Sequence, residues 1–114
     1  MNREGRLTVH VLDTATGRPA AGLSLSLFRI DPAARSPIGT WTTNADGRCD
    51  APLLHGAALT AGVYEIVFDI AGWRVGEAGF YDLIPIRFRI ADSAAHTHIP
   101  LLLSPFGYTT YRGS

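Results

Sequence analysis

Alternation of apolar and polar residues with a period of two constrains the fold of this chain more than any other feature. Residues 7–11 read Leu-Thr-Val-His-Val, and residues 23–27 read Leu-Ser-Leu-Ser-Leu. Similar stretches cover residues 63–70, 84–90 and 97–103. A period of two is typical of β-strands that bury one face. The pattern therefore predicts an all-β chain of short strands arranged as an antiparallel β-sandwich.

Turn-forming residues separate these stretches. Glycine, proline, aspartate and asparagine gather at residues 17–19, 31–32 and 44–47, where they favour tight turns. Pro37 has no backbone N–H, so we do not expect it inside a central strand. The one helix we expect is short and covers residues 73–78.

Length and composition limit the classes of protein. The 114 residues suit a single domain, 1–114, and the formal net charge of zero gives no basic stripe for nucleic acid or a membrane surface. The first six residues are polar and lack the apolar run of a secretory signal. The single cysteine, Cys49, cannot form an internal disulfide. These features predict a cytoplasmic protein.

The alternation also assigns a face to each histidine. His10 alternates with the apolar residues of the first strand and should point away from the core. His96, His98 and Leu102 alternate in the same way with the apolar residues of the strand near the C-terminus. If the two strands are neighbours, His10 and His98 meet on one exterior sheet face. The outward Leu102 indicates a face that a second subunit covers, which would exclude water from the histidines.

Residue types alone leave the roles of these positions open. A lone outward histidine, or the arginine that follows a turn at Arg48, is more often solvated than catalytic. His96 and His98 have the i, i+2 spacing of metal ligands on a strand, but no acidic or cysteine partner stands near them in the sequence, which disfavours zinc. Residues 108–114 suit either a final strand or a frayed end.

Four segments together resemble the transthyretin-like 5-hydroxyisourate hydrolases. Residues 7–20 carry Leu-Thr-Val-His-Val-Leu-Asp-Thr and Gly-Arg-Pro-Ala, and residues 43–48 carry the Asp-Gly-Arg turn. Residues 96–105 read His-Thr-His-Ile-Pro-Leu-Leu-Leu-Ser-Pro, and residues 111–114 form the tetrapeptide Tyr-Arg-Gly-Ser. The segments span nearly the whole chain in the family's order. One departure is Thr97, where the family often has tyrosine.

The resemblance implies a transthyretin-like (prealbumin-like) sandwich of two four-stranded sheets with one short helix. It also implies a homotetramer, a dimer of dimers, with active sites at the subunit interface. The reaction it implies is hydrolysis of 5-hydroxyisourate to 2-oxo-4-hydroxy-4-carboxy-5-ureidoimidazoline in urate degradation, without a metal or an organic cofactor.

The residues implied in this reaction come from all four segments. One histidine removes a proton from water and the other orients the substrate or protonates the leaving nitrogen; which is the base stays open. The arginine binds the carbonyl oxygens of the substrate, and the terminal serine holds a histidine tautomer or the water. The implied catalytic residues are His10, Arg48, His98 and Ser114, and the implied substrate-binding residues are His10, Arg48, Tyr111 and Arg112.

Three other readings of the sequence remain. A non-catalytic small-ligand carrier would share the fold, but transthyretin itself lacks these histidines and the Tyr-Arg-Gly-Ser end. A metal site would use His96 and His98 and would lose its activity to a chelator. An interaction domain without any site would leave the outward histidines exposed in a monomer.

Overall fold

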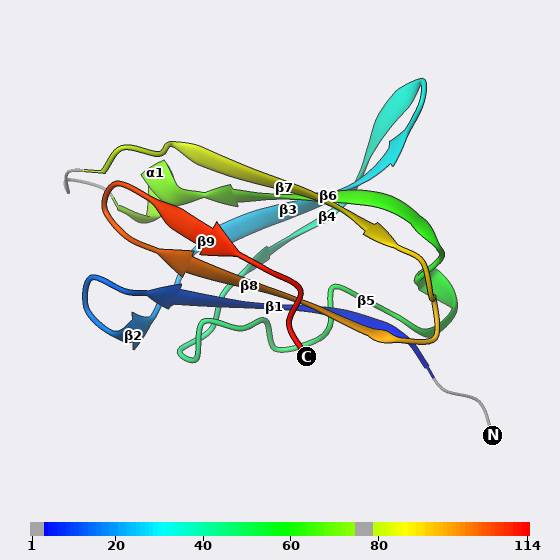
Figure 1. The fold of residues 1–114 in the computed structure, drawn as a ribbon, viewed down its shortest axis with the longest axis horizontal. Helices are drawn as coiled ribbons and strands as arrows, with labels where there is room; N and C mark the ends of the chain where they lie inside the picture. Colours follow the sequence, from blue (N-terminus) through cyan, green and yellow to red (C-terminus); the bar gives the residue numbers. More distant parts are fainter. Residues whose placement is uncertain (1–3, 75–78) are drawn as a thin grey trace.

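The computed structural model describes residues 4–74 and 79–114, which form two β-sheets packed face to face (Figure 1). The first sheet contains β1 (Arg6–Asp13), β2 (Arg18–Pro19), β5 (Leu54–His55), β8 (His96–Leu103) and β9 (Tyr108–Thr110). The second contains β3 (Ser24–Asp31), β4 (Ala34–Thr42), β6 (Gly62–Asp69) and β7 (Leu83–Ile90). A 3-10 turn, η1 (Gly56–Ala58), follows β5.

The strand orders confirm the predicted two-sheet sandwich and correct it in two details. The first sheet runs β2-β1-β8-β9 with β5 also paired to β1, which makes five strands, and the second runs β4-β3-β6-β7. The pair β1 and β8 is parallel, whereas all other strand pairs of the described residues are antiparallel. A parallel pair needs a long crossover. Here the crossover includes the entire second sheet, which lies between β1 and β8 in sequence.

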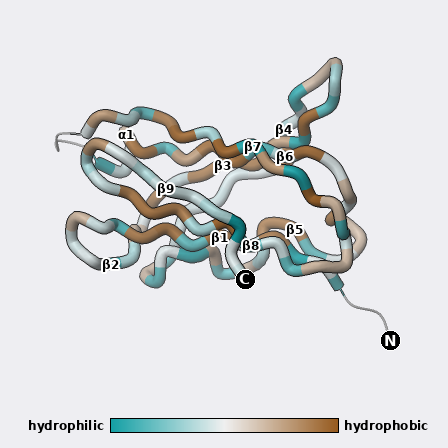
Figure 2. Tube along the Cα trace, in the orientation of Figure 1, coloured by the Kyte–Doolittle hydropathy of each residue, from teal (hydrophilic) through white to brown (hydrophobic). Residues whose placement is uncertain are grey.

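The apolar faces of both sheets meet between the layers. Apolar residues alternate along β1, β6 and β8 in the hydropathy colouring (Figure 2). The burial of these apolar residues between the sheets confirms the inward faces that the alternation predicted. The fully buried side chains, at 0–2% exposure, include Leu7, Val9, Val11, Leu25, Leu27, Tyr64, Ile66, Phe68, Ile84, Leu101 and Leu103.

The short helix lies earlier than predicted. The helix α1 spans Ile70–Trp73, and the Asp69 carboxylate caps it by accepting a hydrogen bond from the Gly72 N–H at 3.0 Å. The prediction of a helix over 73–78 missed this cap, because Asp69 belongs to a strongly alternating strand pattern. Residues 75–78 lie outside the described residues. No helix in residues 4–74 and 79–114 is long and apolar enough to cross a membrane.

Pro37 lies in a strand, but in one at the edge of its sheet. It belongs to β4, which has a neighbour on one side only. The register between β3 and β4 shifts between Leu27 and Phe28, where the ladder is irregular. An edge strand with a bulge tolerates a residue without an N–H. The tip of the β3–β4 hairpin projects beyond the sandwich (Figure 1).

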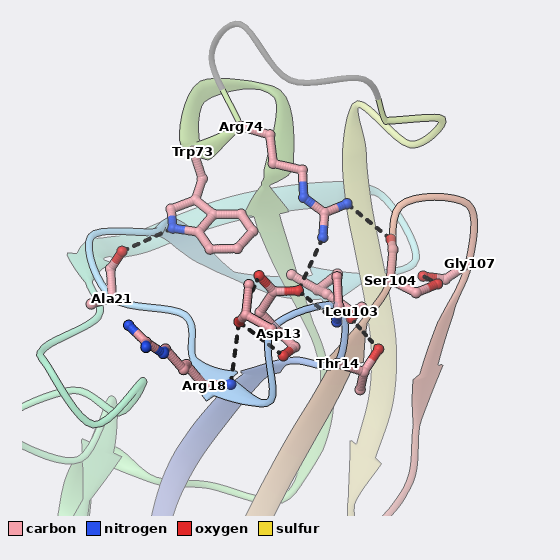
Figure 3. A network of polar contacts seen from close by, with 11 residues as sticks. Asp13, Thr14, Arg18, Ala21, Trp73, Arg74, Leu103, Ser104 and Gly107 are labelled. Atoms are coloured by element: carbon pink, nitrogen blue, oxygen red, sulfur yellow. Dashed lines mark hydrogen bonds and ion pairs between the residues drawn. The ribbon is translucent and has the colours of Figure 1, made fainter.

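A buried ion pair joins α1 to the end of β1 (Figure 3). Arg74 Nη2 lies 3.5 Å from Asp13 Oδ1, and the two side chains are only 7% and 13% exposed. Arg74 Nη1 donates to the backbone oxygen of Ser104 at 2.9 Å. Asp13 Oδ1 also accepts from the Ala15 N–H at 3.0 Å. This network holds the helix, β1 and the loop after β8 together at the end of the sandwich opposite β5.

Candidate active site

The parallel pairing of β1 and β8 places the predicted histidines on one outer sheet face. Thr8 lies opposite His98, and His10 lies opposite Pro100. Facing residues of paired strands share a side of the sheet, so His10 and His98 are diagonal neighbours on the face turned away from the core. Both are partly buried. The predicted juxtaposition of the two histidines is thus present within a single chain.

Arg48 reaches this face because its turn docks against β1. The Val11 N–H donates to the backbone oxygen of Gly47 at 2.8 Å. Gly47 has a φ of +73°, and a Cβ there would lie 2.3 Å from the Val11 oxygen. Only glycine allows both the positive φ and the close approach. Asn44 Oδ1 steadies the turn by accepting from the N–H groups of Asp46 at 2.9 Å and Arg48 at 3.2 Å.

The C-terminal tail continues past β9 and lies against His98. The Gly113 N–H donates to the His98 backbone oxygen at 2.9 Å. A Cβ at Gly113 would lie 2.5 Å from His98 Cδ2 and 3.1 Å from Pro100 Cγ, so the tail packs directly on both rings. This contact explains why Pro100 is buried on an outward face. Ser114 follows Gly113 and is exposed beside the histidine strand.

Tyr111 and Arg112 have a different environment. Both line a cavity of about 230 Å³ between β7 and the tail, together with Phe88, Thr97 and Ile99. Thr97 and Ile99 alternate with His98, so they occupy the opposite side of β8. The single chain therefore brings His10, Arg48 and His98 together with the end of the tail, and it places Arg112 along the edge between the sheets. A substrate-binding role for Tyr111 and Arg112 stays a prediction.

Burial and nearby positive charge both favour the neutral form of the two histidines. Burial lowers the pKa of His98 below its ordinary value, and the positive charge of Arg48 and the neighbouring His96 and His10 lower it further. Burial and Arg48 also lower the pKa of His10. A hydrogen bond to the Asp46 backbone opposes this shift but does not outweigh it. A neutral imidazole accepts a proton, and an adjacent guanidinium stabilises negative charge. The pair of histidines with Arg48 can therefore support proton transfer next to a developing anion.

A shallow hollow of about 250 Å³ opens beside this cluster. Arg6, Thr8, Arg48 and His96 line it from the two strands and the turn. Cys49 also borders the hollow, but burial and the neighbouring Asp50 raise the pKa of its thiol, which disfavours a thiolate nucleophile. No group of three or more His, Cys, Asp or Glu side chains in residues 4–74 and 79–114 is arranged to hold a metal ion.

The structure adds Thr8 to the site and gives Gly113, part of the implied terminal tetrapeptide, a packing role. Thr8 Oγ1 lies 2.8 Å from His98 Nδ1 and 2.6 Å from His96 Nε2. Gly113 supports the opposite edge of the His98 ring. Thr8 stands two residues before His10 and shares its face, so the period of two already indicated its position. Gly113 gave no signal beyond its place in the terminal tetrapeptide.

Fold and site together define a transthyretin-like β-sandwich with a histidine–arginine centre on the outer face of one sheet. The family model described as "HIUase/Transthyretin family" matches residues 7–113. The chain belongs to this family.

Named relatives and solved structures agree with this assignment. The chain is 58% identical to a 5-hydroxyisourate hydrolase of Mesorhizobium japonicum, over 96% of this chain and 93% of that protein. The structure of Klebsiella pneumoniae 5-hydroxyisourate hydrolase superposes with a TM-score of 0.81 at 37% identity, covering 96% of this chain and 99% of that one. The crystal structure of (S)-allantoin synthase superposes with a TM-score of 0.89 at 39% identity, and the match covers 99% of this chain but 45% of that longer one.

Proposed function

We propose that this protein hydrolyses 5-hydroxyisourate to 2-oxo-4-hydroxy-4-carboxy-5-ureidoimidazoline in the degradation of urate. The observation that carries the proposal is the meeting of His10, His98 and Arg48 on one outer face. The names of the relatives at high identity over nearly their full length support this substrate. The reaction opens the six-membered ring by adding water across an amide-like C–N bond.

Each charged or titratable group has one task in this reaction. One of the neutral histidines takes a proton from the attacking water, and the hydroxide adds to the ring carbonyl carbon. Arg48 binds the oxygen that gains negative charge. The other histidine orients the substrate or gives a proton to the leaving ring nitrogen. Such positioned acids and bases contribute about 10²–10⁴-fold each.

The tail completes the site in this proposal. Ser114 follows Gly113, which packs on His98, and in this proposal its hydroxyl orients the water or a histidine. Tyr111 and Arg112 hold the tail along the sheet edge and bind substrate where a second subunit adjoins it.

The active form we propose is a homotetramer, a dimer of dimers, whose subunits cover the histidine face. In the isolated chain this face is a shallow hollow rather than a closed pocket, and the outward Leu102 is only partly buried. Large apolar side chains are also exposed, with Phe80 at 71% and Phe106 at 74%. Exposed apolar residues of this size favour association. Light scattering should give a mass four times that of the chain, and a monomer would contradict the proposal.

We also propose a cytoplasmic location. The support is the single cysteine, Cys49, which leaves the fold without an internal disulfide. Cell fractionation with an antibody to the protein tests this, and recovery outside the cytoplasm would overturn it.

The test of the function generates 5-hydroxyisourate in the cuvette with urate oxidase and then adds the purified protein. The expected result is faster loss of the 5-hydroxyisourate absorbance and faster appearance of the ureidoimidazoline. A His98→Asn variant at the same concentration serves as the control. Saturable binding of the compound without any acceleration would instead favour the carrier, the alternative function for this fold.

A further inference from the structure

We propose that Thr8 is a positioning residue that fixes the tautomer of His98, with His96 as its second partner. The hydroxyl of Thr8 lies between two imidazoles, 2.8 Å from His98 Nδ1 and 2.6 Å from His96 Nε2. Thr8 faces His98 directly in the parallel ladder, so the sheet register itself holds the hydroxyl in place. The kinetic part of this inference rests on the proposed function, whereas the tautomer part does not.

The Thr8 hydroxyl has one proton and two acceptor lone pairs, so it can donate to only one of the two rings. Thr8 can donate to His96 and accept from His98, donate to His98 and accept from His96, or accept from both rings. Hydroxyl donors make bonds of roughly 2.5–3.0 Å, whereas N–H donors to oxygen make bonds of roughly 2.7–3.2 Å. The 2.6 Å contact to His96 is shorter than the N–H range and indicates that the hydroxyl is the donor there, whereas the 2.8 Å contact to His98 fits either donor. With the single hydroxyl proton directed at His96, the hydrogen bond to His98 must use a proton on His98 Nδ1. Thr8 therefore accepts from His98 Nδ1–H and donates to His96 Nε2.

This direction determines what His98 presents to the site. Its Nδ1 edge is held by Thr8, and its Cδ2 edge is packed against Gly113. The free end of the ring is then Nε2, which carries the lone pair when the proton is on Nδ1. A lone pair on Nε2 is what a general base needs. Thr8 thus leaves Nε2 of His98 ready to take a proton from water.

His96 has a defined part in this arrangement. Its Nε2 must be unprotonated to accept from Thr8, and burial together with the positive charge of Arg6 lowers its pKa below the ordinary value. A neutral His96 therefore keeps the Thr8 hydroxyl proton directed at His96 Nε2 and away from His98 Nδ1. Without this acceptor the hydroxyl would be free to turn and donate to His98 Nδ1, which would leave His98 in the opposite tautomer.

Two matched substitutions test the inference. Thr8→Val keeps the shape of the side chain and removes the hydroxyl, and Thr8→Ser keeps the hydroxyl. The ¹⁵N chemical shifts of the His98 ring, measured without substrate at a pH where the ring is neutral, report the tautomer. We expect the Nδ1–H form in the wild type and in Thr8→Ser, and a shift toward the Nε2–H form in Thr8→Val. Thr40→Val, at an exposed position of β4 in the other sheet, serves as the control and should leave the spectrum unchanged.

The kinetics supply the second readout. We expect Thr8→Val to lower kcat roughly 10- to 100-fold with little change in KM, as for other residues that orient a reacting group. Thr8→Ser should recover most of this loss. An unchanged His98 tautomer in Thr8→Val, or a Thr8→Ser variant as impaired as Thr8→Val, would overturn the inference. A wild type with the expected tautomer but without hydrolysis would instead overturn the proposed function and leave the tautomer assignment standing.

Discussion

Two positions on β1, its C-terminal end and its middle, carry polar groups in opposite situations. At its C-terminal end Asp13 points inward, is buried and meets Arg74 in an ion pair. In its middle His10 points outward, is only partly buried and lies close enough to Arg48 for that charge to lower its pKa. One strand thus presents a carboxylate to the interior and an imidazole to the surface, because successive side chains alternate between faces.

The difference between these regions is whether the polar groups satisfy one another. Arg74 bonds to Asp13 and to the Ser104 oxygen, and Asp13 accepts further from the Ala15 N–H, so the buried network leaves little for a ligand to bind (Figure 3). On the outer face the situation differs, because the positive charges of Arg48 and the neighbouring histidines lower the pKa of His98. Lowered histidine pKa values beside an arginine favour proton transfer, whereas a satisfied ion pair holds elements together.

The largest effect we expect comes from the outer face. His98→Asn should lower kcat/KM by about 10²–10⁴-fold, because it removes one of the two histidines that we propose act as acid and base. The free energy of unfolding should change by only about 1 kcal/mol, since one partly exposed hydrogen bond is lost. Steady-state kinetics and urea unfolding of the same preparation measure both quantities. Full activity in this variant would contradict the assignment of His98.

At the buried ion pair we expect the opposite result, a large loss of stability and little loss of activity. Arg74→Ala leaves Asp13 buried without its partner and should lower the free energy of unfolding by about 3–5 kcal/mol. The activity of the folded protein should remain near that of the wild type. Urea unfolding at a fixed protein concentration is the measurement, and Arg18→Ala, on the exposed strand β2, is the control and should change stability by less than about 0.5 kcal/mol. Equal stability of the two variants would show that the pair does not hold this end together.

These two regions were not equally predictable from the sequence. The period of two assigned His10 and His98 to outward faces correctly, because burial in a sandwich follows alternation. The ion pair at Asp13 could not be foreseen, since Arg74 follows a helix whose start depends on the Asp69 cap. Local propensity describes segments of a few residues, whereas this pair joins positions far apart in the chain.

The register between strands explains why the remaining contacts of the site could not be predicted from the sequence. The contact between Thr8 and His98 exists because β1 and β8 are parallel with these two residues opposite each other. A shift of one residue would have turned every outward side chain of one strand inward. No pattern within either strand states its partner or its direction. Likewise, the approach of Arg48 depends on the backbone bond from Val11 to Gly47, which the turn motif alone does not reveal.

A smaller effect should come from the tail. Gly113→Ala places a Cβ where 2.5 Å would separate it from His98 Cδ2, so the ring or the tail must move. A displacement on this scale lowers kcat/KM by on the order of 10- to 100-fold. The matched control is Gly107→Ala, whose Cβ would lie at an ordinary 3.5 Å from Ser104 Oγ. Equal kinetics of the two variants would mean that the contact of the tail with His98 is irrelevant to the reaction.

The smallest effect concerns pH and sharpens the contrast between the two polar regions. The pKa values of His10 and His98 are lowered, chiefly by burial and then by Arg48. Both rings therefore stay neutral as the pH falls to the ordinary histidine pKa of 6.5, and activity should decline only below it. Between the lowered pKa values and 6.5 the unfolded chain binds more protons than the folded one, so the free energy of unfolding should rise with pH across this window.

Removing the charge that contributes to this shift gives the direct check. Arg48→Gln should move the acid limb of the pH–activity profile toward higher pH, because the guanidinium no longer opposes protonation of either ring. Arg18→Gln, whose charge is not among the causes of either shift, should leave the limb in place. An acid limb that stays fixed in Arg48→Gln would show that the histidines and this arginine do not sense one another. The outer face would then be a set of independent solvated groups and not a reaction centre.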